Sequence, residues 1–506
     1  MTGRSNDTQV FDYDAIIVGA GFSGLYMLHL LRDQLGLSTR VYDAASNVGG
    51  AWYWNRYPGA RCDVESIYYQ YMFSEEIFKE WNWTHRFPEW HEIIAYLEFV
   101  AKKLDLKKDI QFNTRVESAY YDDEMNVWRI TTDDGGKATA KYFITCVGNI
   151  TAPNIPKFKG LDQFQGKWYH TARWPKENVD FSGKRVGIIG TGSTGIQAIP
   201  EIAKKAKTLT VFQRTPQYTS PARNRPLDPE LIKKTKENYK EIRESMRSTD
   251  SGLPSMFNPI DRSALDDPPE VRERVYEEAW EKGSVYLQFT YMDITTNAEA
   301  NETICEFIRK KIREIVKDPN TAEKLMPSYY YFTKRPVIDH GYYETYNRDN
   351  VYLVDLRSEP IEEITTKGVR TAKSEYDVDI LVFATGYDTI TGALLNMDIR
   401  GRNGVSLNDK WEAGGNVKTY LGLGIAGFPN MFMCTGPLSP SVLTNMPSAI
   451  EQHVEWIADC IKYLQKHHID TIEADGEAED VWARHNKEVA DATLFPKEKH
   501  SWYTGG

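Results

Sequence analysis

Two glycine clusters, each lying between a predicted strand and a predicted helix, constrain the fold of this chain more than any other feature. The first follows the apolar run at 13–18 and precedes a helical pattern at 25–35. The second repeats this order, with strand patterns at 185–189 and 209–213 around a helical pattern at 196–205. A strand, a glycine turn, a helix and a further parallel strand form the unit of a dinucleotide-binding fold. The sequence therefore predicts an α/β fold with two Rossmann-like dinucleotide-binding domains.

Both clusters have the spacing G-x-G-x-x-G, in which each glycine has its own task. In the first cluster, Gly19 permits the tight turn, Gly21 lets a pyrophosphate approach the backbone, and Gly24 allows the helix to pack closely on the strand. The phosphates then lie at the positive N-terminal end of the helix, beside Ser23. The second cluster repeats these groups as Gly190, Gly192, Ser193, Thr194 and Gly195.

The residue 22 positions after the second glycine of each cluster differs in charge between the two units. After Gly21 it is Asp43, and a carboxylate there can hold a free ribose hydroxyl. After Gly192 it is Arg214, whose guanidinium favours a 2′-phosphate that a carboxylate would repel. FAD and NADPH meet these two requirements, so the first unit is predicted to bind FAD and the second NADPH. A solvated surface arginine is the alternative for Arg214.

The composition excludes several classes of function. Of the 506 residues, 41% are apolar and 26% are charged, as in an ordinary globular protein. A net charge of −11 argues against a nucleic-acid binder, and no apolar run is long enough to cross a membrane. The first ten residues are polar and lack the apolar core of a secretion signal. The five cysteines are scattered, as expected for reduced thiols, so we expect a cytoplasmic protein.

Two dinucleotide sites indicate a flavoenzyme reduced by NADPH but leave its chemistry open. A disulfide reductase needs a redox-active cysteine pair, and the sequence contains no C-x-x-C motif. Hydrolysis finds no support, because neither a G-x-S-x-G nor an H-E-x-x-H motif occurs. The remaining classes are oxidases and monooxygenases.

Two further motifs identify a family. The segment Phe164-Gln-Gly166-Lys-Trp-Tyr-His170-Thr-Ala-Arg-Trp174-Pro175 fits F-x-G-x-x-x-H-x-x-x-W-P, and it resembles the fingerprint of the Baeyer–Villiger monooxygenases. A second signature of that family also fits, with Gly49-Gly50-Ala-Trp52, Tyr57-Pro58-Gly59 and Asp63. The resemblance covers essentially the whole chain, including VFQRTP at 211–216, Lys334-Arg335 and SWY at 501–503. Family members usually continue beyond the position of Gly506.

The resemblance implies an FAD enzyme that is reduced by NADPH and uses O2 to oxidise a small ketone to an ester or lactone. The oxygen passes through a C4a-peroxyflavin in this family, and sulfoxidation is a possible side activity. The resemblance also implies a monomer. Two other functions stay open, namely a flavin-containing N- or S-monooxygenase and an NADPH oxidase that oxygenates nothing. A lactone formed from a cyclic ketone excludes the first, and peroxide release that no ketone affects indicates the second.

The resemblance also assigns roles to residues. Arg335 matches the active-site arginine, which stabilises negative oxygen, and Asp63 matches the carboxylate that orients it; a plain ion pair is the alternative. Lys334 and Thr215 resemble residues that assist Arg214 with the 2′-phosphate. The candidate cofactor-binding residues are Gly19, Gly21, Ser23, Gly24, Asp43, Gly50, Trp52, Trp54, Asp63, Gly190, Gly192, Ser193, Thr194, Gly195, Gln197, Arg214, Thr215, Lys334 and Trp502. Phe164, Gly166, His170, Trp174 and Pro175 are expected to act in conformation, not as reacting groups.

We expect a discontinuous domain organisation. Residues 226–328 are rich in Lys, Glu and Arg at helical spacing, which predicts helices with solvated charged faces. The expected units are an FAD-binding domain (1–150 and 384–506), an NADPH-binding domain (152–223 and 333–383) and a helical insertion (224–332). The active site should lie between the two dinucleotide domains, as ligand sites commonly do.

Overall fold

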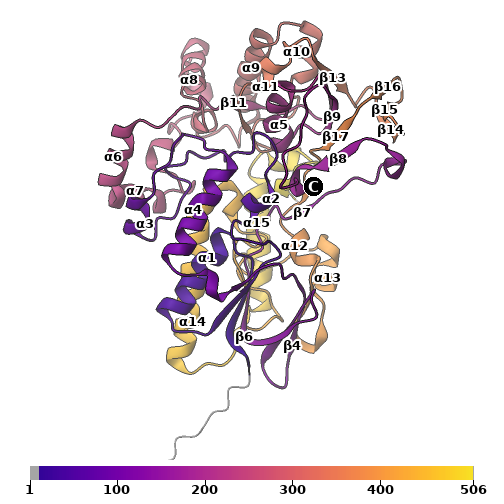
Figure 1. Ribbon diagram of the computed structural model, residues 1–506. Coiled ribbons are helices and arrows are strands. Elements are labelled where there is room, and N and C mark those ends of the chain that lie inside the picture. Colours follow the sequence, from indigo (N-terminus) through magenta and orange to yellow (C-terminus); the bar gives the residue numbers. More distant parts are fainter. Residues whose placement is uncertain (1–10, 505–506) are drawn as a thin grey trace, which may run out of the picture.

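Two β-sheets, one above the other in Figure 1, form the framework of the protein. The computed structural model describes residues 11–504, apart from the side chains of residues 440 and 441, so the polar first ten residues and Gly506 lie outside the described residues. The larger sheet has the order β19-β4-β5-β6-β1-β2-β3, with β20 paired to β6. Its strands are β1 (Tyr13–Val18), β2 (Thr39–Tyr42), β3 (Ile110–Gln111), β4 (Val116–Asp122), β5 (Val127–Thr132), β6 (Lys137–Thr145), β19 (Asp398–Arg400) and β20 (Met431–Met433).

The first glycine cluster lies at the carboxyl end of β1, where this sheet is parallel. β1 pairs in parallel with β2 and β6, and its last four residues are buried, as expected for a strand covered on both faces. The helix that follows, α1 (Phe22–His29), begins three residues before the predicted helical pattern and continues as a π-helical turn over Leu30–Gln34. Helices α4 (Trp90–Lys103) and α14 (Met446–His467) lie beside α1 on this sheet (Figure 1).

The smaller sheet is entirely parallel and has the order β13-β10-β9-β17-β8. Its strands are β8 (Lys167–His170), β9 (Arg185–Ile189), β10 (Thr208–Gln213), β13 (Val351–Asp355) and β17 (Ile380–Phe383). Helix α5 (Ser193–Ala203) begins at the second glycine cluster, again three residues before the predicted pattern. The element order therefore agrees with two Rossmann-like units.

The expected insertion consists of helices at the top and on the left-hand side of Figure 1. They are α6 (Pro229–Glu237), α7 (Tyr239–Arg247), α8 (Pro269–Lys282), α9 (Ala298–Ile315) and α10 (Pro319–Leu325). The run at 231–247, which has one continuous helical pattern in the sequence, is divided between α6 and α7 at Asn238, whose ψ of 22° leaves the helical region. The longest helix of the insertion, α9, starts where the Asn297 side chain accepts hydrogen bonds from Glu299 N and Ala300 N.

Smaller elements connect these parts. The chain passes from one sheet to the other twice, and the two crossings pair as the antiparallel strands β7 (Ala152–Pro153) and β18 (Tyr387–Asp388). The remaining strands are β11 (Thr219–Pro221), β12 (Val337–Asp339), β14 (Ile361–Ile364), β15 (Gly368–Thr371) and β16 (Glu375–Asp377). The remaining helices are α2 (Ala51–Trp54), α3 (Glu75–Glu80), α11 (Tyr342–Thr345), α12 (Gly392–Leu395), α13 (Leu407–Lys410) and α15 (Gly476–Asp491). The described part of the chain ends, at residue 504, near the junction of the two sheets (Figure 1).

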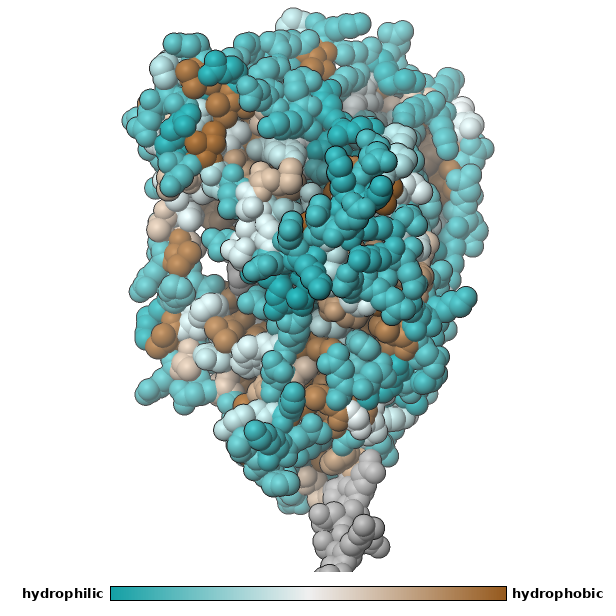
Figure 2. All heavy atoms as spheres, turned by 90° about the vertical axis from the view of Figure 1, so that its left-hand side faces the viewer, coloured by the Kyte–Doolittle hydropathy of each residue, from teal (hydrophilic) through white to brown (hydrophobic). Residues whose placement is uncertain are grey.

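The surface is mostly hydrophilic on the face seen in Figure 2, where apolar side chains gather only in small separate groups. Within residues 11–504, no helix has the length and apolar character needed to cross a membrane.

Candidate active site

The first glycine loop accepts only glycine at its key positions. Gly19 has a φ of +107°, and a Cβ there would lie 2.4 Å from the carbonyl oxygen of Cys146. A Cβ on Gly24 would lie 1.8 Å from the carbonyl oxygen of Gly19, so α1 can pack on β1 only because that atom is missing. A Cβ on Gly21 would approach the Cα of Gly50 to 3.2 Å, so the turn at Gly49-Gly50 (the GG turn) lies directly against the loop. This arrangement fits the close approach of a pyrophosphate.

Asp43 lies at the end of β2, where its carboxylate faces the glycine loop. Oδ2 accepts a hydrogen bond from Ala20 N at 2.6 Å, and Oδ1 accepts one from Ala45 N at 2.7 Å. Burial raises the pKa of Asp43, and these two backbone bonds partly oppose that shift. A carboxylate has about four acceptor positions, so the anchored side chain retains capacity for a ribose hydroxyl.

The second glycine loop has the same geometry and, in addition, an open cradle. Gly190 has a φ of +108°, and a Cβ there would lie 2.4 Å from the carbonyl oxygen of Ala384. A Cβ on Gly195 would lie 2.2 Å from the carbonyl oxygen of Gly190. By contrast, a Cβ on Gly192 would meet no atom within 4 Å, although Gly192 precedes the first turn of α5. Space beside a helix N-terminus fits a bound phosphate.

The two basic residues among those expected to hold the 2′-phosphate differ, because Arg214 has no partner among the described residues and Lys334 has several. Arg214 is exposed and forms no hydrogen bond or ion pair with any described residue. Lys334 Nζ donates to the carbonyl oxygen of His500 at 2.7 Å and pairs with Glu498 at 3.2 Å. It also lies 5.5 Å from the ring centre of Tyr329, whose hydroxyl donates to Gln217 Oε1, three residues after Arg214. Lys334 therefore lies close to the Arg214 loop, but its charge is already neutralised.

Thr215 and Gln197, two further candidates, make contacts within the protein. The carbonyl oxygen of Thr215 accepts a hydrogen bond from Thr191 Oγ1 at 3.0 Å. The buried amide of Gln197 accepts from the Tyr57 hydroxyl at 2.7 Å and donates to the carbonyl oxygen of Arg61 at 2.9 Å. Gln197 thus joins α5 to the segment that precedes Asp63.

Asp63 and Arg335 meet between the two dinucleotide units. Arg335 Nε donates to Asp63 Oδ2 at 2.7 Å, and Nη1 donates to the carbonyl oxygen of Val442 at 3.0 Å. Burial alone would lower the pKa of Arg335, but the charge of Asp63 and its hydrogen bond oppose it and the net shift is upward. The arginine therefore stays cationic, and both side chains remain accessible at 29% and 27% exposure. A fixed positive charge that still faces the pocket can stabilise negative oxygen.

Segments distant in the sequence line a small pocket around this pair. The charged residues in its lining are Asp63 and Arg335. Tyr503, close to the end of the described chain, also lines the pocket, and its ring centre lies 4.6 Å from that of Trp502. The other lining residues are Val64, Ser251, Leu253, Val285, Gln288, Phe289, Phe332, Pro336, Val442, Leu443, Thr444 and Asn445. Apolar side chains predominate in this set, which favours exclusion of water.

The fingerprint histidine joins the two crossings between the sheets. His170 is buried at the end of β8, and its Nε2 lies 3.2 Å from the carbonyl oxygen of Asn154 and 3.1 Å from Thr385 Oγ1. Its Nδ1 accepts from Ala172 N at 3.1 Å, so Nε2 carries the proton that is donated to Asn154. Burial lowers the pKa of His170, which favours this neutral form. Its place favours a conformational role over that of a reacting base.

The rest of the fingerprint packs around the same junction. A Cβ on Gly166 would lie 2.4 Å from Phe164 Cζ and 2.6 Å from a backbone oxygen, so the turn requires glycine. Trp174 is buried against the ring of Tyr169 at 5.5 Å, and Pro175 follows it. The guanidinium of Arg173, the residue before Trp174, lies 4.6 Å from the ring centre of Trp54.

Trp52 and Trp54 follow the GG turn in α2. The indole N–H of Trp52 donates to the Tyr69 hydroxyl at 3.2 Å, and their rings meet edge to face. Trp54, through Arg173, contacts the fingerprint segment. Both side chains thus have protein partners, so neither is free to react.

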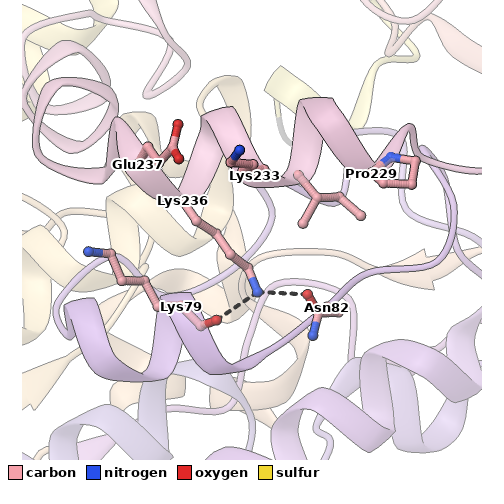
Figure 3. A pocket seen from close by; sticks show the side chains of 7 residues that line it. Lys79, Asn82, Pro229, Lys233, Lys236 and Glu237 are labelled. Carbon is pink, nitrogen blue, oxygen red and sulfur yellow. Dashed lines mark hydrogen bonds between the residues drawn. The ribbon is translucent and has the colours of Figure 1, made fainter.

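A second hollow lies on the surface between α3 and α6 (Figure 3). Lys236 crosses it and donates to the carbonyl oxygen of Lys79 at 2.6 Å and to Asn82 Oδ1 at 2.7 Å. Neither a glycine loop nor the Asp63–Arg335 pair borders this hollow, so it is not the candidate site. Among residues 11–504, no cluster of three or more His, Cys, Asp or Glu side chains could hold a metal ion.

Comparison with known proteins identifies the relatives of this chain. Residues 14–221 match the family described as flavin-binding monooxygenase-like. A Baeyer-Villiger monooxygenase of Pseudooceanicola batsensis is 46% identical over 499 residues, which cover 98% of this chain and 90% of the relative. The chain belongs to the Baeyer–Villiger monooxygenase family. Cyclohexanone 1,2-monooxygenase of Acinetobacter sp is 45% identical, over 98% of this chain and 91% of the relative.

Solved structures agree with this membership. An oxidised steroid monooxygenase bound to NADP has a TM-score of 0.94 at 49% identity, covering 97% of this chain and 93% of that chain. OTEMO in complex with FAD and NADP has a TM-score of 0.94 at 38% identity, covering 97% and 92%. The expected family and the α/β fold with two Rossmann-like domains are therefore confirmed.

Sequence reasoning missed the wall of the pocket that the helical insertion supplies. The insertion was expected to be a solvated helical region, yet Ser251, Leu253, Val285, Gln288 and Phe289 line the pocket. One signal was present: the stretch SVYLQFTY at 284–291 is apolar and aromatic within an otherwise charged region. A stretch of that kind marks burial or contact with a ligand.

Proposed function

We propose that this protein is an FAD-containing, NADPH-dependent monooxygenase that uses O2 to convert ketones to esters or lactones. The Asp63–Arg335 pair carries the proposal, because it places a permanent cation in a pocket between two dinucleotide-binding units. Membership of the Baeyer–Villiger family supports the same reaction.

The residues that would hold the two cofactors fit them. The first loop (Gly19, Gly21, Ser23, Gly24), together with Asp43 and Gly50, would hold FAD, with Trp52 and Trp54 beside it. The second loop (Gly190, Gly192, Ser193, Thr194, Gly195), with Arg214, would hold NADPH, assisted by Lys334 once Glu498 releases it. The flavin, reduced by NADPH, supplies the activation of O2. Gln197 and Thr215 would act on NADPH indirectly, through the loops they support.

Arg335 performs the electrostatic part of the reaction. Oxygen insertion passes through species with negative oxygen, and a cation fixed beside them lowers the barrier. Asp63 holds Nε, and the Val442 carbonyl holds Nη1, so the guanidinium is oriented before the substrate arrives. The apolar walls keep water from competing for that charge.

The test is product formed per NADPH consumed. Purified protein with FAD, NADPH, O2 and a panel of cyclic and linear ketones should yield lactones or esters in near-stoichiometric ratio to NADPH. Hydrogen peroxide as the sole product, whatever the ketone, would indicate an NADPH oxidase instead.

One relative favours a second candidate function, the oxygenation of nitrogen. A phenazine N-monooxygenase of Lysobacter antibioticus is 44% identical, over 99% of this chain and 91% of the relative. An aromatic N-heterocycle added to the same panel tests it, because an N-oxide formed faster than any ester would make nitrogen the preferred target.

The domain division, the compartment and the assembly state are also proposals. Membership of β19 and β20 in the larger sheet supports a discontinuous FAD-binding domain that includes residues 384–506. Five unpaired cysteines support a cytoplasmic location. A monomer follows from the family resemblance, and analytical ultracentrifugation tests it.

A further inference from the structure

One part of the pocket wall is polar, uncharged and without internal partners. Gln288 lines the pocket from the helical insertion, and its side-chain amide forms no hydrogen bond within the described part of the chain. An amide offers both a donor and an acceptor. Such a group on the wall of this pocket has its hydrogen-bonding capacity available to a ligand.

A second polar group in the same pocket has only acceptor capacity to spare. The Asn445 Nδ2 donates to the carbonyl oxygens of Tyr68 at 2.9 Å and Gly252 at 3.3 Å, which fixes the orientation of the amide. Asn445 is 2% exposed, and its Oδ1 has no hydrogen-bond partner among the described residues. A buried acceptor without a donor is costly, so a ligand that brings a donor gains from it.

The charges of the pocket exclude ionic substituents. Asp63 and Arg335 are the charged residues among those that line it, and each is the ion-pair partner of the other. A carboxylate on the substrate would lose its hydration and compete with the reacting oxygen for Arg335, and an ammonium group would compete with Arg335 for Asp63. The group that satisfies a free acceptor and a free amide without carrying charge is a hydroxyl.

We infer that the substrates of this enzyme are ketones that carry a hydroxyl group. Gln288 binds this hydroxyl, while Arg335 stabilises the negative charge on the reacting oxygen. This inference rests on the proposed ketone oxidation and adds the substrate class. A hydroxyl accepts from Gln288 Nε2 and donates to Gln288 Oε1 or to Asn445 Oδ1. Gln288 is thus a specificity-determining residue contributed by the insertion.

The test compares 4-hydroxycyclohexanone with 4-methylcyclohexanone, which differ by a hydroxyl and a methyl of similar size. The measured quantity is the ratio of their kcat/KM values, in the wild-type enzyme and in Gln288→Leu. Because the intrinsic reactivity of each ketone cancels between the two proteins, the change in the ratio isolates the contact. The ratio should fall about tenfold in Gln288→Leu, the size of one hydrogen bond.

Val285→Ala is the matched control, because it alters the same wall without changing its polarity. It should change kcat/KM for both ketones by the same factor and leave their ratio unchanged. An unchanged ratio in Gln288→Leu would overturn the inference while leaving ketone oxidation intact. If neither these two ketones nor any ketone of the panel yields a lactone or ester, the proposed function fails instead. The inference is then tested by binding, through the perturbation of the flavin spectrum by each ketone, where the same tenfold change in the Kd ratio is expected.

Discussion

Arg335 donates a hydrogen bond to Asp63 across a separation of 272 residues. Each residue lies beside one of the two dinucleotide-binding units, so the pair forms only when both units are folded and in contact. The same guanidinium also donates a hydrogen bond to the carbonyl oxygen of Val442, which belongs to a third segment of the chain. The orientation of this cation therefore depends on three separate segments of the chain.

Replacing Arg335 by alanine should uncouple NADPH oxidation from oxygenation. The variant should fold, bind FAD and accept hydride, but the loss of one such stabiliser costs on the order of 10²–10³ in the rate of ester formation. The measurements are ester and hydrogen peroxide per NADPH. Asp63→Ala should show a milder form of the same defect, because the arginine survives but is misplaced. Ester formation by Arg335→Ala at the wild-type rate would contradict the role given to this residue.

Replacing Arg214 by alanine should weaken NADPH selectively. The 2′-phosphate is present in NADPH and absent from NADH, so the affinity for NADPH should fall by about 2 kcal/mol while that for NADH changes little. Stopped-flow reduction of the flavin over a range of each nucleotide measures both. Arg223→Ala is the control, since Arg223 is also exposed but pairs with Glu281. Equal losses for the two nucleotides would show that Arg214 does not contact the phosphate.

Gly192→Ala should separate NADPH binding from folding. An added Cβ at Gly192 meets no protein atom within 4 Å, so the thermal midpoint and the FAD content should stay at their wild-type values. The methyl would nevertheless enter the space expected for the pyrophosphate, and NADPH affinity should fall at least tenfold. Gly476→Ala adds a Cβ to equally open space at the start of α15 and should change neither property. Undiminished NADPH affinity in Gly192→Ala would place the nucleotide elsewhere.

The contribution of Glu451, in α14, to the stability of the protein should decrease as the pH rises from about 4.5 through about 7. Burial, together with the charge of Glu455, raises the pKa of Glu451 from 4.5 to about 7, against hydrogen bonds from Met72 N and Phe73 N and the charge of Arg243. The folded state therefore binds the proton more tightly than the unfolded chain. The resulting stabilisation is complete below about pH 4.5 and is lost as the pH rises through about 7.

Glu451→Gln tests this, because glutamine stays neutral and can still accept both backbone bonds. The variant and the wild type should unfold at similar temperatures near pH 5, whereas at pH 8 the variant should be more stable by up to about 3 kcal/mol. Glu362→Gln, at an exposed strand position, should show no such divergence. Parallel pH profiles for wild type and Glu451→Gln would mean that Glu451 does not titrate in this range.

Local pattern was sufficient to predict the framework. The glycine clusters, the flanking strands and the charged helices were predicted because each depends on residues close together in the sequence. The break at Asn238 was missed, because the charged pattern of 231–247 continues through it. The pairing of Lys334 with the chain end was also missed, since no local pattern links residue 334 to residues 498 and 500.

The site was predicted unevenly for the same reason. Motifs identified Asp63 and Arg335, and the structure brings them together. Cofactor binding by Gln197 stays a prediction, and its hydrogen bonds to Tyr57 and Arg61 were not foreseen, because only the packing of two units creates them. Gln288 and Asn445 belong to no motif. The role proposed for them rests on the unpaired side-chain amide of Gln288 and the unpaired Oδ1 of Asn445, which no local sequence pattern indicates.

The division of the pocket wall among distant segments has a consequence for how this protein can change over time. The cofactor loops and the Asp63–Arg335 pair come from the two dinucleotide units, whereas Gln288 comes from an insertion that contributes to neither sheet. Mutations in the insertion can therefore change the pocket wall without impairing redox chemistry. New substrate preferences can evolve in one stretch of the gene while the cofactor loops and the Asp63–Arg335 pair stay unchanged. Laboratory libraries confined to residues 251–289 should accordingly yield a high fraction of active, coloured enzymes with altered selectivity.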